Sequence, residues 1–212
     1  LGAFPIRAAK TGMLGGAEQI LAVSTVWREL GQSTPLVVDP VMVAKGGSAL
    51  LEEDAVAALK AQLLPRATLV TPNLPEAERL VGFPVRTVAE QELAAKALCA
   101  AGAGAALVKG GHAYGDPVDV LCDGKETLHY KATRMRTRNT HGTGCTLASA
   151  IAARMARGRT LVQAVQDAHT YVQEAIRQAP DIGRGDGHGV RYGARCRQGS
   201  DPHRVRASRT RD

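Results

Sequence analysis

Aromatic residues are scarce in this sequence, and long apolar runs are absent from it. Phe, Trp and Tyr together make up 3% of the 212 residues, whereas hydrophobic residues of all kinds make up 44%. A core must therefore be built from Ala, Val, Leu and Ile, which suits helices packed on a buried parallel sheet. The length allows one sizeable α/β domain and is too short for two ordinary domains with linkers. No run approaches the roughly 20 apolar residues of a membrane-spanning helix, so we expect a soluble protein with no membrane partner.

The cysteines lack the spacing of a metal site or a disulfide framework. Cys99, Cys122, Cys145 and Cys196 are far apart, and none belongs to a C-x-x-C pair. This pattern argues against a zinc ribbon and favours reduced cysteines in a cytoplasmic enzyme. The sequence begins at Leu1 rather than Met, within what looks like folded sequence. We therefore expect an amino-terminally truncated domain, for which the lack of a signal peptide is uninformative.

The excess of positive charge lies mostly at the carboxyl end. The formal net charge is +7, but residues 181–212 hold eight Arg and four Asp, which leaves +3 for residues 1–180. After Pro180 the apolar periodicity stops and Gly, Arg and Asp dominate, a composition typical of disorder. We predict one folded domain over residues 1–182 and a disordered basic tail over residues 183–212, with no nucleic-acid partner. The alternative for the tail is a basic arm that binds nucleic acid.

The hydrophobic pattern predicts alternating strands and helices. Short apolar runs that end in polar turns predict buried strands, and a loose alternation around Asp123-Gly124 predicts a β-hairpin. The expected strands cover residues 36–41, 68–73, 105–111, 117–123 and 126–132. The expected helices cover residues 17–30, 52–63, 75–81, 87–102, 143–157 and 160–179, the fourth opening with a Thr87–Glu90 capping box.

This order is the layout of an open, mostly parallel sheet with helices on both faces. Ligands of such sheets bind at the carboxyl ends of the strands. Asp39, Asn73 and Lys109 each follow a predicted strand. We therefore expect a ligand site where these three polar side chains meet.

The strongest chemical signal is NTHGTGC, residues 139–145, which runs into an apolar helical pattern. Gly142 and Gly144 allow a tight turn, with Thr143 between them, where a helix begins. A helix start offers unpaired N–H donors and the positive end of a dipole, so it attracts phosphate. Cys145 holds the place of a proton-handling group beside a phosphoryl group, and we expect the helix start to lower its pKa.

The alternative for this segment is a glycine turn before a buried helix, with Cys145 packed as a small apolar residue. A G-x-G turn taken alone does not decide between the two interpretations. The sequence has no G-x-x-x-x-G-K-[ST] motif, which argues against a P-loop enzyme as far as this segment shows.

A second signal is TPNLPEAE, residues 71–78, which spans a strand-to-helix turn. Asn73 and Glu76 are three residues apart and could direct an amide and a carboxylate at a hydrated Mg²⁺, with Asp39 as a second carboxylate. Magnesium keeps most of its waters and needs only one or two protein carboxylates. The alternative is a capped helix in which Glu76 stabilises the first turn. Lys109, in VKGGH (108–112), suits either a phosphate or a structural ion pair.

Five motifs together resemble one family in order and spacing: KTGML (10–14), DPVMVAKGG (39–47), TPNLPEAE, VKGGH and NTHGTGC. NTHGTGC resembles the anion-hole signature of the ribokinase superfamily, whose glycines cradle the γ-phosphate and whose last position is usually Asp. A Cys at that position, with Thr-His before the glycines, is similar to the hydroxymethylpyrimidine/phosphomethylpyrimidine kinases of thiamine biosynthesis. The resemblance covers about residues 2–183.

This resemblance implies a ribokinase-like fold and ATP-dependent phosphorylation of 4-amino-5-hydroxymethyl-2-methylpyrimidine and of its monophosphate, with ATP and Mg²⁺ required. Cys145 would be catalytic, and Gly142, Thr143 and Gly144 would form the anion hole. The remaining implied residues are Lys109 and Thr140 for the ATP phosphates, Met13 and Val41 for the pyrimidine, and Asp39 and Glu76, supported by Asn73, for Mg²⁺ through water. Members of the family are commonly homodimers.

The chain departs from the family pattern at both ends. Members begin with a strand and a glycine-rich segment before KTGML, which have no counterpart here, and they end soon after a stretch similar to GRGDGHG (183–189). The alternatives are a pyridoxal or pyridoxine kinase of the same superfamily and an inactive remnant that binds nucleotide.

Overall fold

Six strands form one mixed sheet in this computed structural model, which describes residues 4–31, 33–42, 52–111, 115–135, 137 and 140–179. The strands lie in sequence order, so β1 and β6 are the edges. The first four are parallel, and β5 and β6 are antiparallel to their neighbours. Their bounds are β1 Ala9–Thr11, β2 Leu36–Val38, β3 Leu69–Val70, β4 Ala106–Val108, β5 Val118–Cys122 and β6 Thr127–Lys131. The predicted mostly parallel sheet is confirmed.

The predicted hairpin is confirmed as well, and its turn has a local cause. Gly124 adopts a φ of 84°, a left-handed conformation that favours glycine. The Asp123 side chain accepts hydrogen bonds at 2.9 Å from the N–H groups of Lys125 and Glu126. The Asp-Gly pair therefore reverses the chain between β5 and β6.

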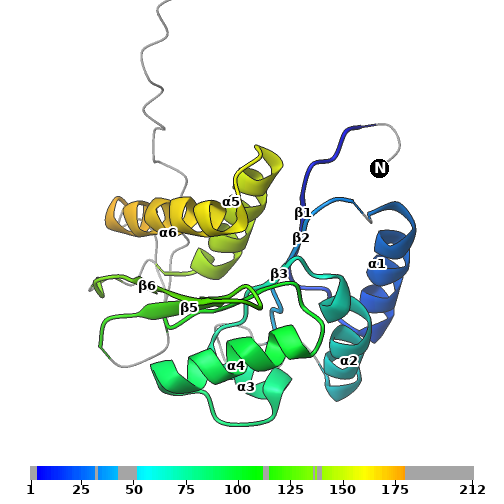
Figure 1. The fold of residues 1–212 in the computed structure, drawn as a ribbon, viewed down its shortest axis with the longest axis horizontal. Coiled ribbons are helices and arrows are strands. Elements are labelled where there is room, and N and C mark those ends of the chain that lie inside the picture. The colour runs from blue at the N-terminus through cyan, green and yellow to red at the C-terminus, as the bar shows by residue number, and fades with distance from the viewer. Residues whose placement is uncertain are drawn as a thin grey trace, which may run out of the picture.

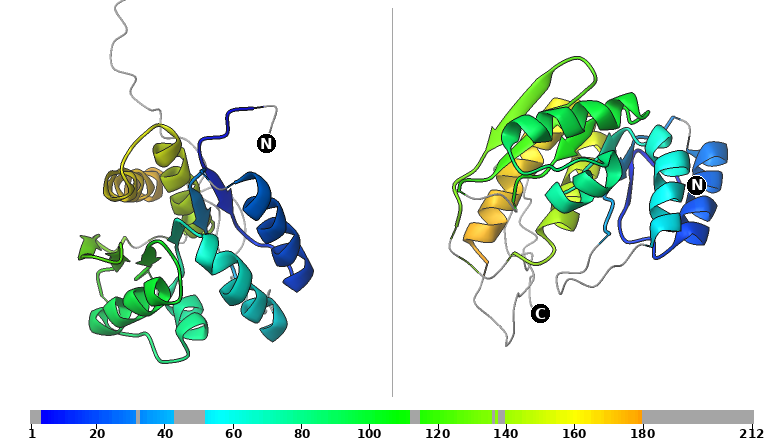
Figure 2. Two further views of the ribbon diagram at one scale, coloured as in Figure 1. Left: turned by 45° about the vertical axis from the view of Figure 1, so that its right-hand side comes forward. Right: turned by 90° about the horizontal axis from the view of Figure 1, so that it is seen from below.

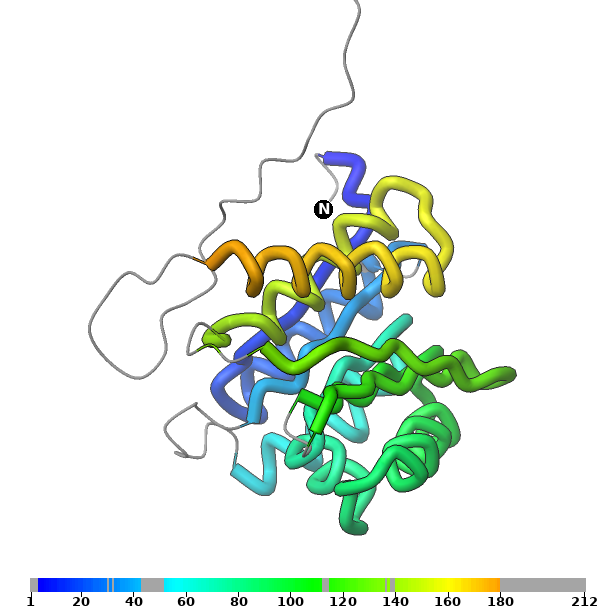
Figure 3. The backbone as a smooth tube through the Cα atoms, turned by 90° about the vertical axis from the view of Figure 1, so that its left-hand side faces the viewer, coloured from blue at the N-terminus to red at the C-terminus, as the bar shows by residue number. Residues whose placement is uncertain are grey.

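Helices cover both faces of the sheet. α1, α2, α3 and α4 pack on one face, and α5 and α6 pack together on the other (Figures 1 and 2). Figure 3 shows the pair α5 and α6 on a single side of the strands. The α-helical bounds are α1 Ala17–Leu30, α2 Glu53–Ala58, α3 Leu74–Val81, α4 Val88–Ala100, α5 Thr143–Ala156 and α6 Leu161–Arg177.

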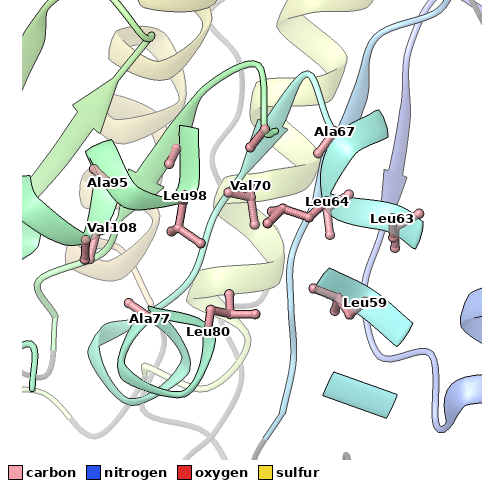
Figure 4. Packing of buried hydrophobic residues seen from close by; sticks show 14 of the residues in the cluster. Leu59, Leu63, Leu64, Ala67, Val70, Ala77, Leu80, Ala95, Leu98 and Val108 are labelled. Carbon is pink, nitrogen blue, oxygen red and sulfur yellow. The ribbon is translucent and has the colours of Figure 1, made fainter. Parts of the chain in front are cut away.

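Two apolar clusters fill the spaces between the sheet and its helices. Successive side chains of a strand point to opposite faces. Accordingly, Ala106 and Val108 of β4 belong to the cluster under α1–α4, whereas Leu107 belongs to the cluster under α5 and α6. Figure 4 shows part of the first cluster, in which Leu and Ala residues of the helices meet Val70 and Val108 of the sheet. Full burial of a Leu or Val side chain stabilises the fold by about 1.5–3 kcal/mol.

Two segments differ from the sequence predictions. Strand β1 was not predicted. The helix expected over 52–63 is α-helical only to Ala58 and continues as a wider turn over Leu59–Leu63 and a tight turn over Leu64–Arg66. The other predicted helices are confirmed, including the capping box of Thr87 and Glu90 at the start of α4.

The proposed basic tail, residues 183–212, lies outside the described residues, and its predicted disorder stays a prediction. Within the described part of the chain, no helix combines the length and apolar character that crossing a membrane requires.

Candidate active site

The carboxyl ends of the parallel strands bring Asp39, Asn73 and Lys109 together, as predicted. Asp39 follows β2 directly, and Lys109 follows β4 directly. Lys109 pairs with Asn73 through a parallel bridge, and its N–H donates to the Pro72 carbonyl at 2.8 Å. The Lys109 ammonium lies 2.9 Å from Asp39 Oδ1, and the Asp39 side chain is 2% exposed. A buried ion pair therefore stands at the predicted ligand edge of the sheet.

Burial alone would lower the pKa of Lys109, because desolvation disfavours the ammonium. The carboxylates of Asp39 and Glu76 outweigh that effect, and the pKa of Lys109 is raised. Lys109 thus remains a cation in a site where water is largely excluded, which is the form a phosphate needs.

Lys10 is a second cation at this site, and the sequence reasoning assigned it no role. It belongs to β1, the edge strand, and its ammonium lies 3.9 Å from Asp39 Oδ2. The Asp39 carboxylate therefore has one lysine near each oxygen. Lys10 is the first residue of the KTGML motif. No strand was predicted there, so the sequence did not place its side chain at the site.

Asp119 was missed as well. It lies in β5, and its carboxylate accepts the N–H of Gly110 at 2.8 Å. This contact fixes the backbone turn that directly follows Lys109. Asp119 therefore helps to position the lysine, and its charge also acts on the Lys109 ammonium.

The start of α3 places Glu76 at the site through a reciprocal capping box. The Asn73 side chain accepts the N–H of Glu76 at 2.9 Å, and the Glu76 carboxylate accepts the N–H of Asn73 at 2.8 Å. Glu76 is 4% exposed. Its pKa is raised, chiefly by burial, against the attraction of Lys109 and the hydrogen bonds from the Asn73 and Met42 backbone. The Glu76 side chain therefore both caps α3 and interacts with the charge of Lys109.

The start of α5 is a glycine turn, as predicted. Gly142 caps the helix with a φ of 79°, a conformation that favours glycine. The Thr143 hydroxyl donates to the Thr140 carbonyl at 2.9 Å, which closes the turn. No side chain caps the helix, so the N–H groups of its first turn, which contains Gly144 and Cys145, lack partners within the helix.

Helix α5 packs against β1 and β2, and this brings its first turn to the ends of those strands. A Cβ atom on Gly144 would lie 3.2 Å from the Lys109 ammonium, so the lysine reaches the loop backbone itself. The Lys109 ammonium therefore lies beside the Gly142–Gly144 turn, and the role of these residues in binding an anion stays a prediction. Thr140 contributes its carbonyl to the turn, and its role toward phosphate stays a prediction.

The expected low pKa of Cys145 is wrong in direction. Desolvation and the Asp39 carboxylate, which is within hydrogen-bonding reach of the thiol, raise the pKa of Cys145, while Lys10 and Lys109 oppose the rise. The helix start was visible in the sequence, whereas the approach of Asp39 depends on the packing of α5 over β2. Cys145 is exposed, so a substrate has access to it.

The residues expected to contact the pyrimidine lie beside these groups in sequence. Met13, two residues after β1, is 62% exposed, and Val41, two residues after Asp39, is half-buried. Their roles as pyrimidine contacts stay predictions.

Two buried carboxylates, Asp39 and Glu76, form a donor set that suits a hydrated magnesium ion. Their charges act on each other and on Lys109. Mg²⁺ prefers oxygen ligands, keeps several waters and takes one or two carboxylates together with substrate phosphates. Among the described residues no group of three or more His, Cys, Asp and Glu side chains gathers to hold a metal, so an all-protein cage is not what this geometry offers. The raised pKa of Glu76, caused by burial, marks a carboxylate that a nearby divalent cation would stabilise.

Comparison with known proteins assigns the chain to a family. The family model described as phosphomethylpyrimidine kinase matches residues 1–190. The chain belongs to this family.

Relatives carry the corresponding names. The hydroxymethylpyrimidine/phosphomethylpyrimidine kinase of Streptomyces coelicolor is 45% identical over 86% of this chain and 67% of its own length, and that of Rhizobium meliloti is 46% identical over 87% and 69%. The thiamine biosynthesis bifunctional protein of Geobacter sulfurreducens is 47% identical, and the match spans 86% of this chain but 37% of that protein. The relatives are thus longer than this chain.

Solved structures share the ribokinase-like fold. The phosphomethylpyrimidine kinase of Clostridium difficile matches with a TM-score of 0.73 at 35% identity, over 82% of this chain and 71% of that one. The pyridoxal kinase of Staphylococcus aureus in complex with ADP matches with a TM-score of 0.84 at 33% identity, over 93% and 71%. The fold is therefore common to kinases that act on pyrimidines and kinases that act on pyridoxal.

Proposed function

We propose that this chain transfers the γ-phosphoryl group of ATP to 4-amino-5-hydroxymethyl-2-methylpyrimidine and then to its monophosphate, in thiamine diphosphate biosynthesis. The observation that carries the proposal is the junction of Lys109, Asp39 and Cys145, where the uncapped start of α5 meets the strand ends. Membership of the phosphomethylpyrimidine kinase family supports the choice of substrate.

The anion hole and Lys109 suit the phosphates of the nucleotide. The first turn of α5 has N–H groups without partners in the helix, and the helix dipole favours negative charge there. Lys109 adds a full positive charge beside Gly144. Phosphoryl transfer makes few covalent demands, so positioning and charge neutralisation of this kind supply most of the catalysis.

Magnesium, when bound with the nucleotide, would neutralise charge on the phosphates. Asp39 and Glu76 are the residues that would hold it through water. Asn73 keeps Glu76 in place through the capping box. Lys109 balances part of the carboxylate charge before the nucleotide arrives.

Cys145 is the proposed acceptor of the proton from the substrate hydroxyl. Its sulfur lies on the first turn of α5, beside Asp39. A raised pKa makes the thiolate scarce near neutral pH but a strong base once formed. The attacking oxygen forms its bond to the γ-phosphorus while the bond to ADP breaks, and the proton passes to Cys145.

A pyridoxal kinase activity is the second candidate, favoured by the match to the Staphylococcus aureus pyridoxal kinase. An ATP-dependent assay with hydroxymethylpyrimidine, its monophosphate and pyridoxal in parallel separates the two. We expect turnover of both pyrimidines and at least tenfold lower kcat/KM for pyridoxal. A preference for pyridoxal would contradict the proposal, and nucleotide binding without turnover of any substrate would identify an inactive remnant.

We further propose a cytoplasmic homodimer, as the family resemblance implies. Light scattering on the purified chain measures the mass of the assembly directly. A monomeric mass at micromolar concentration would contradict the dimer without affecting the kinase proposal.

A further inference from the structure

We propose that Lys10 binds the phosphate of the pyrimidine monophosphate and so serves the second transfer more than the first. The inference rests on the proposed function, because it assigns a residue to one of its two substrates. It starts from the two lysines that flank Asp39, which occupy different sides of that carboxylate.

The two ammonium groups differ in how strongly Asp39 engages them. Lys109 lies 2.9 Å from Oδ1, a hydrogen-bonded ion pair. Lys10 lies 3.9 Å from Oδ2, within reach of the charge but beyond hydrogen-bonding distance. An ammonium group has three donors. Lys10 is therefore held at the site by charge, and within the part of the chain that the structure describes its ammonium donates no hydrogen bond.

The two lysines also lie against different pieces of backbone. A Cβ atom on Gly144 would meet the Lys109 ammonium at 3.2 Å, whereas one on Gly12 would meet the Lys10 ammonium at 2.8 Å. Gly144 belongs to the anion hole, which faces the donor nucleotide. Gly12 directly precedes Met13, the residue expected to contact the pyrimidine. Lys109 thus faces the donor phosphates, and Lys10 faces the acceptor.

Lys10 is also the more exposed of the two lysines. Its side chain is 19% exposed, against 12% for Lys109, so a ligand can contact it.

The two acceptors place different demands on this position. The hydroxymethyl group is neutral and must lose a proton, which passes to Cys145. A phosphate monoester carries a charge of about −1.5 to −2 at pH 7, so its attacking oxygen can be unprotonated. That oxygen forms a bond to the γ-phosphorus, and the electron pair of the broken bond leaves with ADP. The second transfer therefore needs an additional cation more than it needs a base, and Lys10 provides one.

Equilibrium binding of the two pyrimidines to the whole chain, measured by calorimetry without nucleotide, tests the assignment. We expect Lys10→Met to weaken the monophosphate about 10- to 100-fold, the effect of losing charge-assisted hydrogen bonds, and the alcohol less than threefold. Lys10→Arg should retain most of the monophosphate affinity. Lys96→Met, which removes an exposed lysine of α4, should change neither.

Three outcomes would overturn the inference. Equal losses for both pyrimidines would make Lys10 a structural partner of Asp39, and unchanged monophosphate affinity in Lys10→Met would leave it without the role. A wild-type chain that binds the alcohol but not the monophosphate would contradict it as well. A wild-type chain that binds neither pyrimidine instead defeats the proposed function, on which this inference depends. Lys10→Gln, with circular dichroism of each variant, separates lost binding from lost folding.

Discussion

Asp39 receives contacts from four different parts of the fold. Lys10 comes from β1, Lys109 from the end of β4, and the Thr71 hydroxyl, which follows β3, lies 3.4 Å from Oδ1. Cys145 approaches from α5. A buried carboxylate is tolerated only when paired, and the partners of Asp39 come from separate parts of the fold.

Cys145 gives the most direct test of chemistry at the residue scale. If its sulfur takes the proton of the substrate hydroxyl, Cys145→Ala should lower kcat for hydroxymethylpyrimidine by about 10²–10⁴-fold, the usual contribution of a general acid or base. ATP affinity should change little, because it depends on backbone N–H groups. Steady-state kinetics with both substrates varied provide the measurement.

Cys145→Asp distinguishes a proton-handling role from simple packing. A carboxylate at this position can accept the proton, so the variant should recover part of the activity that Ala loses. If Cys145 only packs, Ala is nearly neutral and Asp is worse because it adds a charge beside Asp39. Near-wild-type turnover by the alanine variant would remove Cys145 from the mechanism.

Glu76→Gln tests the metal site without removing the helix cap. Glutamine also serves at the third position of a capping box, so the stability of the metal-free protein should not fall, and burial no longer opposes a charge. The Mg²⁺ concentration for half-maximal thermal stabilisation by ATP should rise roughly tenfold, or about 1.4 kcal/mol. Glu90→Gln is the matched control, since Glu90 holds the same position in the exposed capping box of α4. An equal Mg²⁺ dependence in the two variants would exclude Glu76 from the site.

At the scale of elements, the first turn of α3 joins folding to function. Asn73→Ala removes the acceptor of the Glu76 N–H, and the loss of an N-cap costs about 1 kcal/mol of stability. Thr87→Ala removes the corresponding cap of α4 and should cost a similar amount. Only Asn73→Ala should also weaken the stabilisation by Mg²⁺ and ATP, because Glu76 loses its position. Chemical denaturation with and without the nucleotide measures both effects, and parallel behaviour of the two variants would show that the cap has no functional part.

Elements with strong local patterns could be predicted from the sequence. The apolar stripe and following glycine defined α1, the Thr87–Glu90 box defined the start of α4, and Asp123-Gly124 defined the hairpin. Strand β1 was not predicted because Ala-Lys-Thr has no strand pattern of its own. Its pairing with Leu36–Val38 of β2 makes it a strand. Such pairing is a nonlocal contact, and no window of sequence contains it.

The segment after α2 shows a second limit of local patterns. Leu63 and Leu64 are consecutive and both fully buried, whereas consecutive residues of an α-helix point about 100° apart. The wider turn over Leu59–Leu63 and the tight turn to Arg66 place both side chains in the core. Tertiary packing therefore changed the type of helix, although the prediction that the segment is helical was sound.

The predictions for the candidate site likewise succeeded where topology determined the contact and failed where a nonlocal contact decided it. The meeting of Asp39, Asn73 and Lys109 followed from parallel topology alone, because each residue follows a parallel strand. Lys10 was missed because its strand was missed. The pKa of Cys145 was predicted in the wrong direction because the helix start is local, whereas the Asp39 carboxylate comes from another element.

At the scale of the whole molecule, the sheet is stabilised by apolar packing on both faces, and the site lies at the carboxyl ends of its parallel strands. Helix α4 closes part of the first face against β4 and β5. In that contact Cys99 lies 3.5 Å from the carbonyl of Cys122, at the end of β5. Cys99 and Cys122 contribute to this packing, whereas Cys145 lies at the start of α5 and is exposed.

This packing predicts how stability changes at alkaline pH. Desolvation by burial, followed by the neighbouring Cys122, raises the pKa of Cys99 from 9.0 to about 12. The unfolded chain releases this proton near pH 9, whereas the folded chain retains it, so the stabilisation is complete below pH 9 and is lost as pH rises toward 12. Between pH 8 and pH 10.5, Cys99→Ala should therefore lose less stability than the wild type, by on the order of 1 kcal/mol. Urea denaturation at both pH values, under reducing conditions, measures the difference. Any packing defect of the variant is present at both pH values and cancels in the comparison. The ionisation of lysines and tyrosines, which both proteins share, cancels as well. An identical pH dependence in the two proteins would show that Cys99 ionises as readily in the folded chain as in the unfolded one.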